Sequence, residues 1–260
     1  MDLRRVFEHT TYTVNRRLLA YTVAIIVMSV ITSFMLLFPG YGVSVDTWIS
    51  GQLTMVSIIF KILIALQISR IAREITSGEI QLYLAHTLTR SEYLLSMLLA
   101  SWFTSTVILV SSYLVTFSIT APNLIISGDI LKPLTYLVPD LLFIALITLF
   151  FASRGREGIA SAIGTALPIL LPLALSIAFS SYIYISHPVY TQMFYVFTVV
   201  LGLMNPYIYN LLYTNYQNNP YISQGGLSGL PYPSINTLAS ITLSIAIIII
   251  TFILFKKKDL

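Results

Sequence analysis

Residues 73–98 read REITSGEIQLYLAHTLTRSEYLLSML, and this stretch interrupts a chain that otherwise avoids charge. Only 9% of the 260 residues are Asp, Glu, Lys or Arg. Five of them fall in this stretch, namely Arg73, Glu74, Glu79, Arg90 and Glu92. Long apolar runs lie on both sides of it. The stretch is therefore a polar connection between two apolar elements.

Two helix-start signals lie within this connection. Thr76-Ser77-Gly78-Glu79 has the spacing of a capping box, in which Thr caps the helix and Glu reaches back to a free amide. This box predicts a short helix over 77–86. Thr89-Arg90-Ser91-Glu92 repeats the pattern and opens the next apolar run. The predicted order is a short helix, a turn and a new long helix.

The short helix is predicted to be amphipathic. Helical spacing brings Ile80, Tyr83, Leu84 and Thr87 to one face, while Glu79, Gln81 and His86 point elsewhere. A plain connection needs only a few residues, and this one runs to about twenty. One interpretation is a connector that rests on lipid headgroups, and the other is a docking element.

The rest of the chain is apolar enough to have lipid as its main solvent. Hydrophobic residues make up 57% of the sequence, and a bilayer core of about 30 Å needs roughly 20 apolar residues per helix. We expect an all-α membrane protein with a single transmembrane domain over residues 1–260. The six runs that qualify as spans are 18–38, 49–69, 93–119, 134–153, 159–182 and 235–255.

The basic residues predict how these spans are oriented, because Lys and Arg stay on the cytoplasmic side of short loops. With six spans, one side receives twelve of the fourteen basic residues. The opposite side receives only Lys132, and Lys61 falls inside the second span. We therefore expect both termini and the 70–92 loop to be cytoplasmic. The twelve are Arg4, Arg5, Arg16, Arg17, Arg70, Arg73, Arg90, Arg154, Arg156, Lys256, Lys257 and Lys258.

Residues 187–234 form an external segment in this topology. The run 189–204 is apolar but only 16 residues long, and Asn205 and Pro206 follow it at once. A seventh span would place Lys256–Lys258 outside, so we predict a re-entrant helix that turns at Asn205-Pro206. The remainder is rich in Tyr, Asn, Pro and Gly, which suits a cap on the outer leaflet. An exit gate or a docking surface for an outside partner is the alternative.

Two ionisable residues lie within the predicted spans. Lys61 either snorkels to the inner headgroups or lines an inward-facing cavity. Asp140 follows Pro139, a pair typical of a helix opening near the outer end of the fourth span. A pair between Lys61 and Asp140 requires similar depth, which these span boundaries do not provide.

The sequence lacks the motifs of several kinds of chemistry. It contains no cysteine, no G-x-x-x-x-G-K-[ST] phosphate loop and no metalloprotease or serine-hydrolase motif. The three histidines, His9, His86 and His187, have no metal-ligand spacing. Basic residues are not clustered with aromatics on a soluble face, so nucleic acid is not an expected partner. We expect neither an enzyme nor a bound metal or cofactor.

The polar connection resembles a known pattern. From Glu74 it reads E-x-x-x-G-E-I-x-L-x-L-A-x-x-L-T-R-S-E-Y, which is similar to the E-x-x-x-G-T-L-E-L-L-L-x-x-P-V-S-R loop of type-2 ABC transporter permeases. It departs from that pattern at Glu79, where Thr is usual, at Thr87, where Pro is usual, and at Met97, where Lys often follows. Six spans, cytoplasmic termini, a basic N-terminal stretch and an Asn-Pro dip before the last span extend the resemblance over the whole chain.

The resemblance implies a function and a set of partners. Residues 70–92 would carry a coupling helix that docks on a separate ATPase subunit, and residues 1–17 would form an interfacial elbow drawn to anionic lipid. Two ATPase subunits would bind ATP and Mg, and a second permease copy would complete a homodimer or heterodimer. The implied ATPase-contact residues are Glu74, Gly78, Glu79, Leu82, Thr89 and Arg90.

Such a protein would be a multi-pass permease of the plasma membrane that exports a hydrophobic or amphipathic cargo. One alternative is a mechanical transducer of the same fold that acts on an external partner without translocation. The other is a structural subunit of a different membrane complex that has no ATPase.

Overall fold

A computed structural model describes residues 2–37, 45–86, 88–120, 125–126, 128, 131–184, 188–218, 227 and 229–257. Over these residues the regular secondary structure is entirely helical. Thr87, His187, Lys258 and, within the expected Tyr-rich cap, residues 219–226 and 228 lie outside the described residues. The main elements are α1 (Leu3–Arg16), α2 (Leu18–Leu37), α3 (Val45–Thr76), α4 (Glu79–His86), α5 (Arg90–Leu98), the π-helix η1 (Leu99–Phe103), α6 (Thr104–Thr120), α8 (Leu131–Ala152), α9 (Glu157–Tyr184), α10 (Pro188–Met204), α11 (Pro206–Gln217) and α12 (Pro233–Lys256).

Five helical stretches among the described residues are long and apolar enough to cross a membrane. They are Leu53–Thr76, Arg90–Ser118, Leu131–Ala152, Glu157–Tyr184 and Pro233–Lys256. They coincide with five of the six expected spans, so the expectation of a helical, multi-pass membrane protein is confirmed at this level. The expected first span corresponds to α2, which runs over Leu18–Leu37, and its crossing of the membrane stays a prediction.

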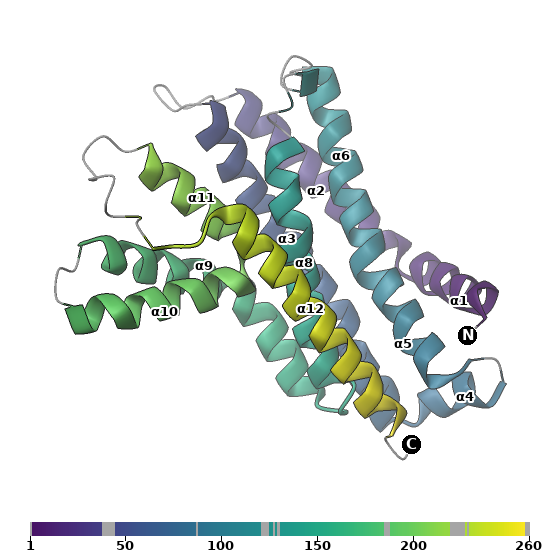
Figure 1. Cartoon of the computed structure of the whole chain (residues 1–260). Helices are drawn as coiled ribbons and strands as arrows, with labels where there is room; N and C mark the ends of the chain where they lie inside the picture. The colour runs from purple at the N-terminus through teal and green to yellow at the C-terminus, as the bar shows by residue number, and fades with distance from the viewer. Residues whose placement is uncertain are drawn as a thin grey trace.

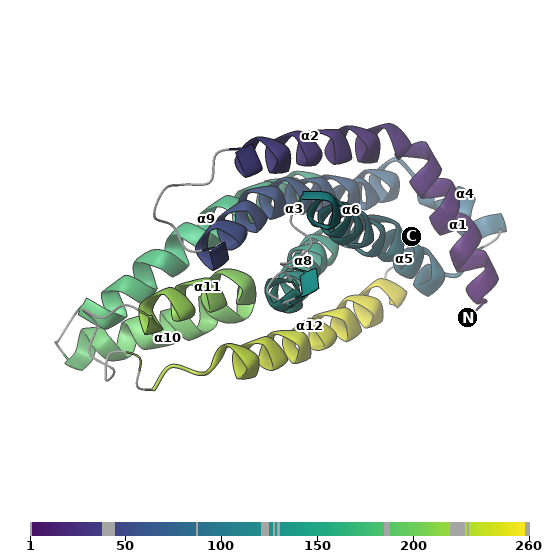
Figure 2. The same ribbon diagram turned by 90° about the horizontal axis from the view of Figure 1, so that it is seen from above.

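The helices form a bundle around α3 and α8. Helix α3 packs against α8 and α9, α12 packs against α8, and α2 lies beside α3 and α6 (Figures 1 and 2). The buried core runs along these contacts and contains Phe60, Ile64, Tyr113 and Leu141, each less than 1% exposed. Many apolar side chains on α2, α9, α10 and α12 remain exposed on the surface of the bundle, as lipid-facing helices require.

Helix α9 approaches α3 closely because of a glycine. A Cβ atom built on Gly164 would lie 2.4 Å from Ala65 Cβ and 2.9 Å from Thr148 Oγ1. Small residues at such a crossing let two helix backbones pack tightly, which is the usual source of helix association in lipid. Gly164 therefore fixes the spacing of α3, α8 and α9.

Helices α5 and α6 form one continuous helical stretch that contains a π-helical turn. The turn is η1, and the Thr104 hydroxyl donates to the Leu99 carbonyl at 3.1 Å within it. A π-turn widens the helix locally and is often found at functional sites. Here the turn meets the start of α2, because the Tyr21 hydroxyl donates to the Ala100 carbonyl at 2.5 Å.

The two chain termini lie at one end of the bundle. Figure 1 shows the N-terminal end of α1, the short helix α4 and the C-terminal end of α12 together there. An arrangement with both termini on one side agrees with an even number of crossings. Which side of the membrane this is remains a prediction from the basic residues.

Candidate functional site

The polar connection folds as a tight turn followed by α4. Helix α3 continues through Thr76, whose hydroxyl donates to the Arg73 carbonyl at 3.0 Å. Gly78 makes the turn with φ of 78°, a conformation that favours glycine. The expected cap at Thr76 and helix over 77–86 are therefore wrong in detail, because Thr76 closes α3 and α4 starts at Glu79.

The second predicted helix start is confirmed. Thr89 caps α5, and both bonds of the capping box with Glu92 are present. The Glu92 carboxylate also accepts the Asp2 backbone N–H at 2.5 Å. The same residue thus starts α5 and holds the first residues of α1.

Helix α4 has an inner and an outer face. Ile80 is buried, and Tyr83 and Leu84 pack against the core, as the helical spacing predicts. Leu82 points away and its side chain is 66% exposed. Gln81 and Ala85 are exposed beside it. An exposed leucine on a short, anchored helix is a suitable contact for a partner protein.

A shallow hollow lies next to this outer face. It encloses about 460 Å³ and is lined by Gln81, Leu84, Ala85, Leu88, Thr89 and Arg90. The Arg90 guanidinium also donates to the Lys256 carbonyl at 3.1 Å. Thr89 and Arg90 therefore sit at the edge of the outer surface, with Arg90 tied to the end of α12.

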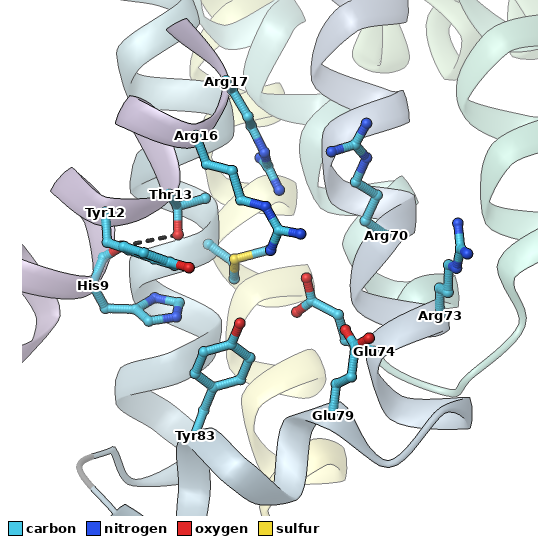
Figure 3. A pocket seen from close by; sticks show the side chains of 11 residues that line it. His9, Tyr12, Thr13, Arg16, Arg17, Arg70, Arg73, Glu74, Glu79 and Tyr83 are labelled. Atoms are coloured by element: carbon cyan, nitrogen blue, oxygen red, sulfur yellow. Dashed lines mark hydrogen bonds between the residues drawn. The ribbon is translucent and has the colours of Figure 1, made fainter.

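Glu74 and Glu79 face the opposite side of α4, toward a second cavity of about 300 Å³. Figure 3 shows their carboxylates in the same space as Arg16, Arg17 and Arg70. The Tyr93 hydroxyl donates to the Glu74 carboxylate in a short hydrogen bond. Of the six expected contact residues, Glu74 is thus engaged inside the protein, whereas Leu82 projects outward.

Helix α1 packs against α5, the helix that begins where the polar connection ends. His9 Nδ1 lies 2.8 Å from the Ser96 hydroxyl, and the Ser96 hydroxyl donates to the Tyr93 carbonyl at 2.8 Å. Which of the two side chains donates depends on the tautomer of His9. Burial, and secondarily the charge of Arg17, lowers the pKa of His9 below its ordinary value.

Lys61 and Asp140 form a buried ion pair between α3 and α8. The distance from Lys61 Nζ to Asp140 Oδ2 is 2.5 Å, and both side chains are 1% exposed. The expected snorkelling of Lys61 and the expected helix opening at Asp140 are wrong, and Lys61 is sealed in the core instead of lining an open cavity. The reason is that α3 and α8 extend beyond the predicted spans, with Pro139 inside α8, so both residues lie near mid-helix.

The expected turn at Asn205-Pro206 is a joint between two helices. Asn205 caps α11 by accepting the Ile208 backbone N–H at 3.1 Å, and Pro206 occupies the first helical position, which needs no donor. The Asn236 side-chain amide of α12 donates to the Gly202 carbonyl at 2.8 Å. Helices α10 and α11 are therefore anchored to the last span, while their depth in a membrane stays a prediction.

The arginine-lined cavity was not predicted from the sequence. The feature of the sequence that corresponds to it is two pairs of arginines, Arg16-Arg17 at the end of α1 and Arg70 with Arg73 one turn apart in α3. The sequence places all four on one side of the membrane but does not show that they converge. Among the described residues, no group of His, Cys, Asp and Glu has the arrangement of a metal site.

Comparison of the sequence with models of known protein families and with curated proteins finds no match. The type-2 permease resemblance thus rests on the loop pattern and the predicted topology alone.

Proposed function

We propose that this chain is the membrane-spanning permease subunit of an ATP-driven ABC transporter. A separate ATPase subunit would dock on α4 and drive the spans. The observation that carries the proposal is the polar connection: a short anchored helix, with Leu82 exposed at its outer face, lies between two long apolar helices at the end of the bundle that holds both termini.

The contacts around α4 support a role in transmitting force. Gly78 joins α4 to α3 through a two-residue turn, and Thr89 joins it to α5. Glu92 links α5 to α1, and Arg90 links it to α12. A push on the outer face of α4 would therefore act on α3 and α5, its neighbours in the chain, and through α5 on α1 and α12.

The remaining parts of the proposal follow from the family resemblance. Two ATPase subunits would hold ATP and Mg, and a second permease copy, identical or related, would complete the path. The apolar spans favour a hydrophobic or amphipathic cargo that is exported across the plasma membrane. Both termini and α4 would face the cytoplasm.

Affinity purification from native membranes tests this proposal. The tagged wild-type chain should bring down an ATPase with a phosphate-loop motif, and the complex should hydrolyse ATP. Leu82→Asp places a charge in the docking surface and should reduce the recovered ATPase at least about tenfold, as a central interface residue does. Ile126→Asp is the matched control, because Ile126 is 83% exposed and lies in the connection between α6 and α8.

The control variant should recover as much ATPase as the wild type. Purification of the wild-type chain without any nucleotide-hydrolysing partner contradicts the proposal. Equal recovery with Leu82→Asp and Ile126→Asp contradicts the assignment of α4 as the docking helix.

A further inference from the structure

Two hollows meet near Arg17, just before α2 begins, and Arg70, close to the end of α3. The first is the polar cavity of about 300 Å³ between α1, α3 and α4. The second is a groove of about 340 Å³ between α2 and α3, lined by Ala20, Ile59, Ile62, Leu63 and Leu66. Arg17 and Arg70 line both of them. The combined site therefore has two parts: the polar cavity, which we call the charged head, and the α2–α3 groove, which is apolar.

The charged head has an excess of positive charge. Arg16, Arg17, Arg70 and Arg73 line it against only two carboxylates, Glu74 and Glu79. Within the described part of the chain, the ion pairs found within 4.0 Å involve other basic residues: Arg4 with Glu8, Arg5 with Asp2, and Lys61 with Asp140. None of the four cavity arginines forms an ion pair within 4.0 Å with a described carboxylate, and Glu74, which lies in the same cavity, already accepts the Tyr93 hydroxyl.

Arg17 makes this imbalance unusual because its side chain is buried, at 7% exposed. Its guanidinium donates to the Ser101 hydroxyl at 3.2 Å and to the Gln67 carbonyl at 3.5 Å, and both partners are neutral. Burial, with the nearby charge of Arg70 adding to it and the charge of Glu74 opposing it, lowers the pKa of Arg17 below its ordinary value. A buried cation is stable when an opposite charge accompanies it, and Figure 3 shows Arg16 and Arg70 turned toward the same space.

The apolar groove has the length of one membrane leaflet. It follows α3 from Arg70 to Ile59, which is about 16 Å at 1.5 Å per residue. Half of a bilayer core measures about 15 Å. The charged head lies at the end where α1 and α4 leave the bundle, as a lipid headgroup would. The dimensions and the charge therefore match the same kind of ligand.

We propose that this site binds one anionic glycerophospholipid, with its phosphate among Arg16, Arg17 and Arg70 and an acyl chain in the α2–α3 groove. The bound lipid would join the α1–α2 junction to α3. Because Arg17 also contacts the π-turn through Ser101, the lipid would stabilise the docking of α1 at the base of the polar connection. This proposal does not depend on the transport function proposed above.

Lipid titration of the purified, delipidated full-length chain tests the proposal. Native mass spectrometry would count bound lipid, and thermal unfolding in detergent would report stabilisation. Phosphatidylglycerol should bind at least fivefold more tightly than phosphatidylcholine with the same chains, because each arginine near an anionic headgroup contributes about a fivefold change in affinity. Glycerol 3-phosphate, which has no acyl chain, should bind far more weakly than phosphatidylglycerol.

Three variants localise the binding. Arg16→Gln and Arg70→Gln remove exposed arginines, so the fold should persist, and each should weaken phosphatidylglycerol binding about fivefold. Arg156→Gln makes the same change in charge at an exposed position outside the site and should leave binding unchanged.

Equal affinity for phosphatidylglycerol and phosphatidylcholine would overturn the proposal, as would an equal effect of all three variants. Glycerol 3-phosphate binding as tightly as the lipid would assign the cavity to a soluble phosphate and also overturn it. The titration uses the chain alone, so its result is independent of whether an ATPase partner exists.

Discussion

At the scale of single residues, the Lys61–Asp140 pair places two charges in the buried interior of the bundle. Lys61 lies one helical turn before Ala65, and Asp140 lies one turn before Ile144. Ala65 and Ile144 pack together with Leu171. A buried pair contributes little net stability relative to apolar residues, but a single charge left without its partner is costly. The pair therefore constrains how α3 and α8 align.

We expect Lys61→Met and Asp140→Leu each to destabilise the protein by about 3–5 kcal/mol, because each leaves one buried charge. The double variant Lys61→Met/Asp140→Leu should recover stability close to the wild type. Unfolding in mixed detergent micelles measures all three. A double variant as unstable as the sum of the two single variants would show that the pair does not interact energetically.

His9 makes the docking of α1 dependent on pH. Its pKa in the folded protein lies below the ordinary value of 6.5, so the neutral ring stabilises the docked helix. That contribution is fully present above about pH 6.5 and is lost as the pH falls through the lowered pKa. Protonation would also place a cation near Arg17, with Tyr83 and Tyr93 on the remaining sides of the ring.

We expect acidification from pH 7.5 to 5.5 to expose the buried face of α1. The chain has no cysteine, so Val6→Cys, at a position 2% exposed in the wild type, gives one thiol that reports undocking. Labelling with a disulfide reagent that reacts in acid should accelerate as the pH falls. His9→Gln should remove this dependence, and an identical pH profile in its presence would contradict the role of His9.

The sequence predicted part of the residue-level picture. The capping box at Thr89 and the inner face of α4 were predictable because both depend on local spacing. The Lys61–Asp140 pair and the arginine cavity were not, because both join helices that are far apart in the chain. Placing them needs the register between helices, which hydropathy does not provide.

At the scale of helices, the crossing of α9 with α3 depends on Gly164. We expect Gly164→Ala to destabilise the protein by about 1–3 kcal/mol, the usual cost of overpacking, because the new methyl group would meet Ala65 Cβ at 2.4 Å. Gly158→Ala in the same helix is the control, since nothing lies within 4 Å of its added Cβ. Equal thermal shifts for the two variants would contradict a close crossing at Gly164.

The lengths of the apolar runs predicted where the membrane helices lie better than they predicted where each helix begins and ends. Each expected span corresponds to a helical stretch, and five of these qualify as candidate spans among the described residues, but α3 extends to Val45–Thr76 from the expected 49–69. The π-turn at Leu99–Phe103 was not predictable, because Leu-Ala-Ser-Trp-Phe fits an α-helix equally well. The start of α4 was displaced by two residues because Thr76 bonds back to α3.

At the scale of the whole molecule, the orientation in the membrane is a prediction from the twelve basic residues that six spans would place on one side. In intact cells, an impermeant maleimide should label Ile126→Cys and should not label Leu82→Cys until the membrane is opened. Each variant carries a single thiol, and both positions are highly exposed. Labelling of position 82 from outside would reverse the predicted topology.

The central claim is that α4 is held by an ATPase, and cross-linking from α4 in native membranes tests it most directly. A photoreactive amino acid at position 82 should form a covalent adduct with a protein that contains a phosphate-loop motif, while the same group at position 126 should not. An adduct at position 82 with lipid alone, or with a protein that has no nucleotide-binding motif, would contradict the claim.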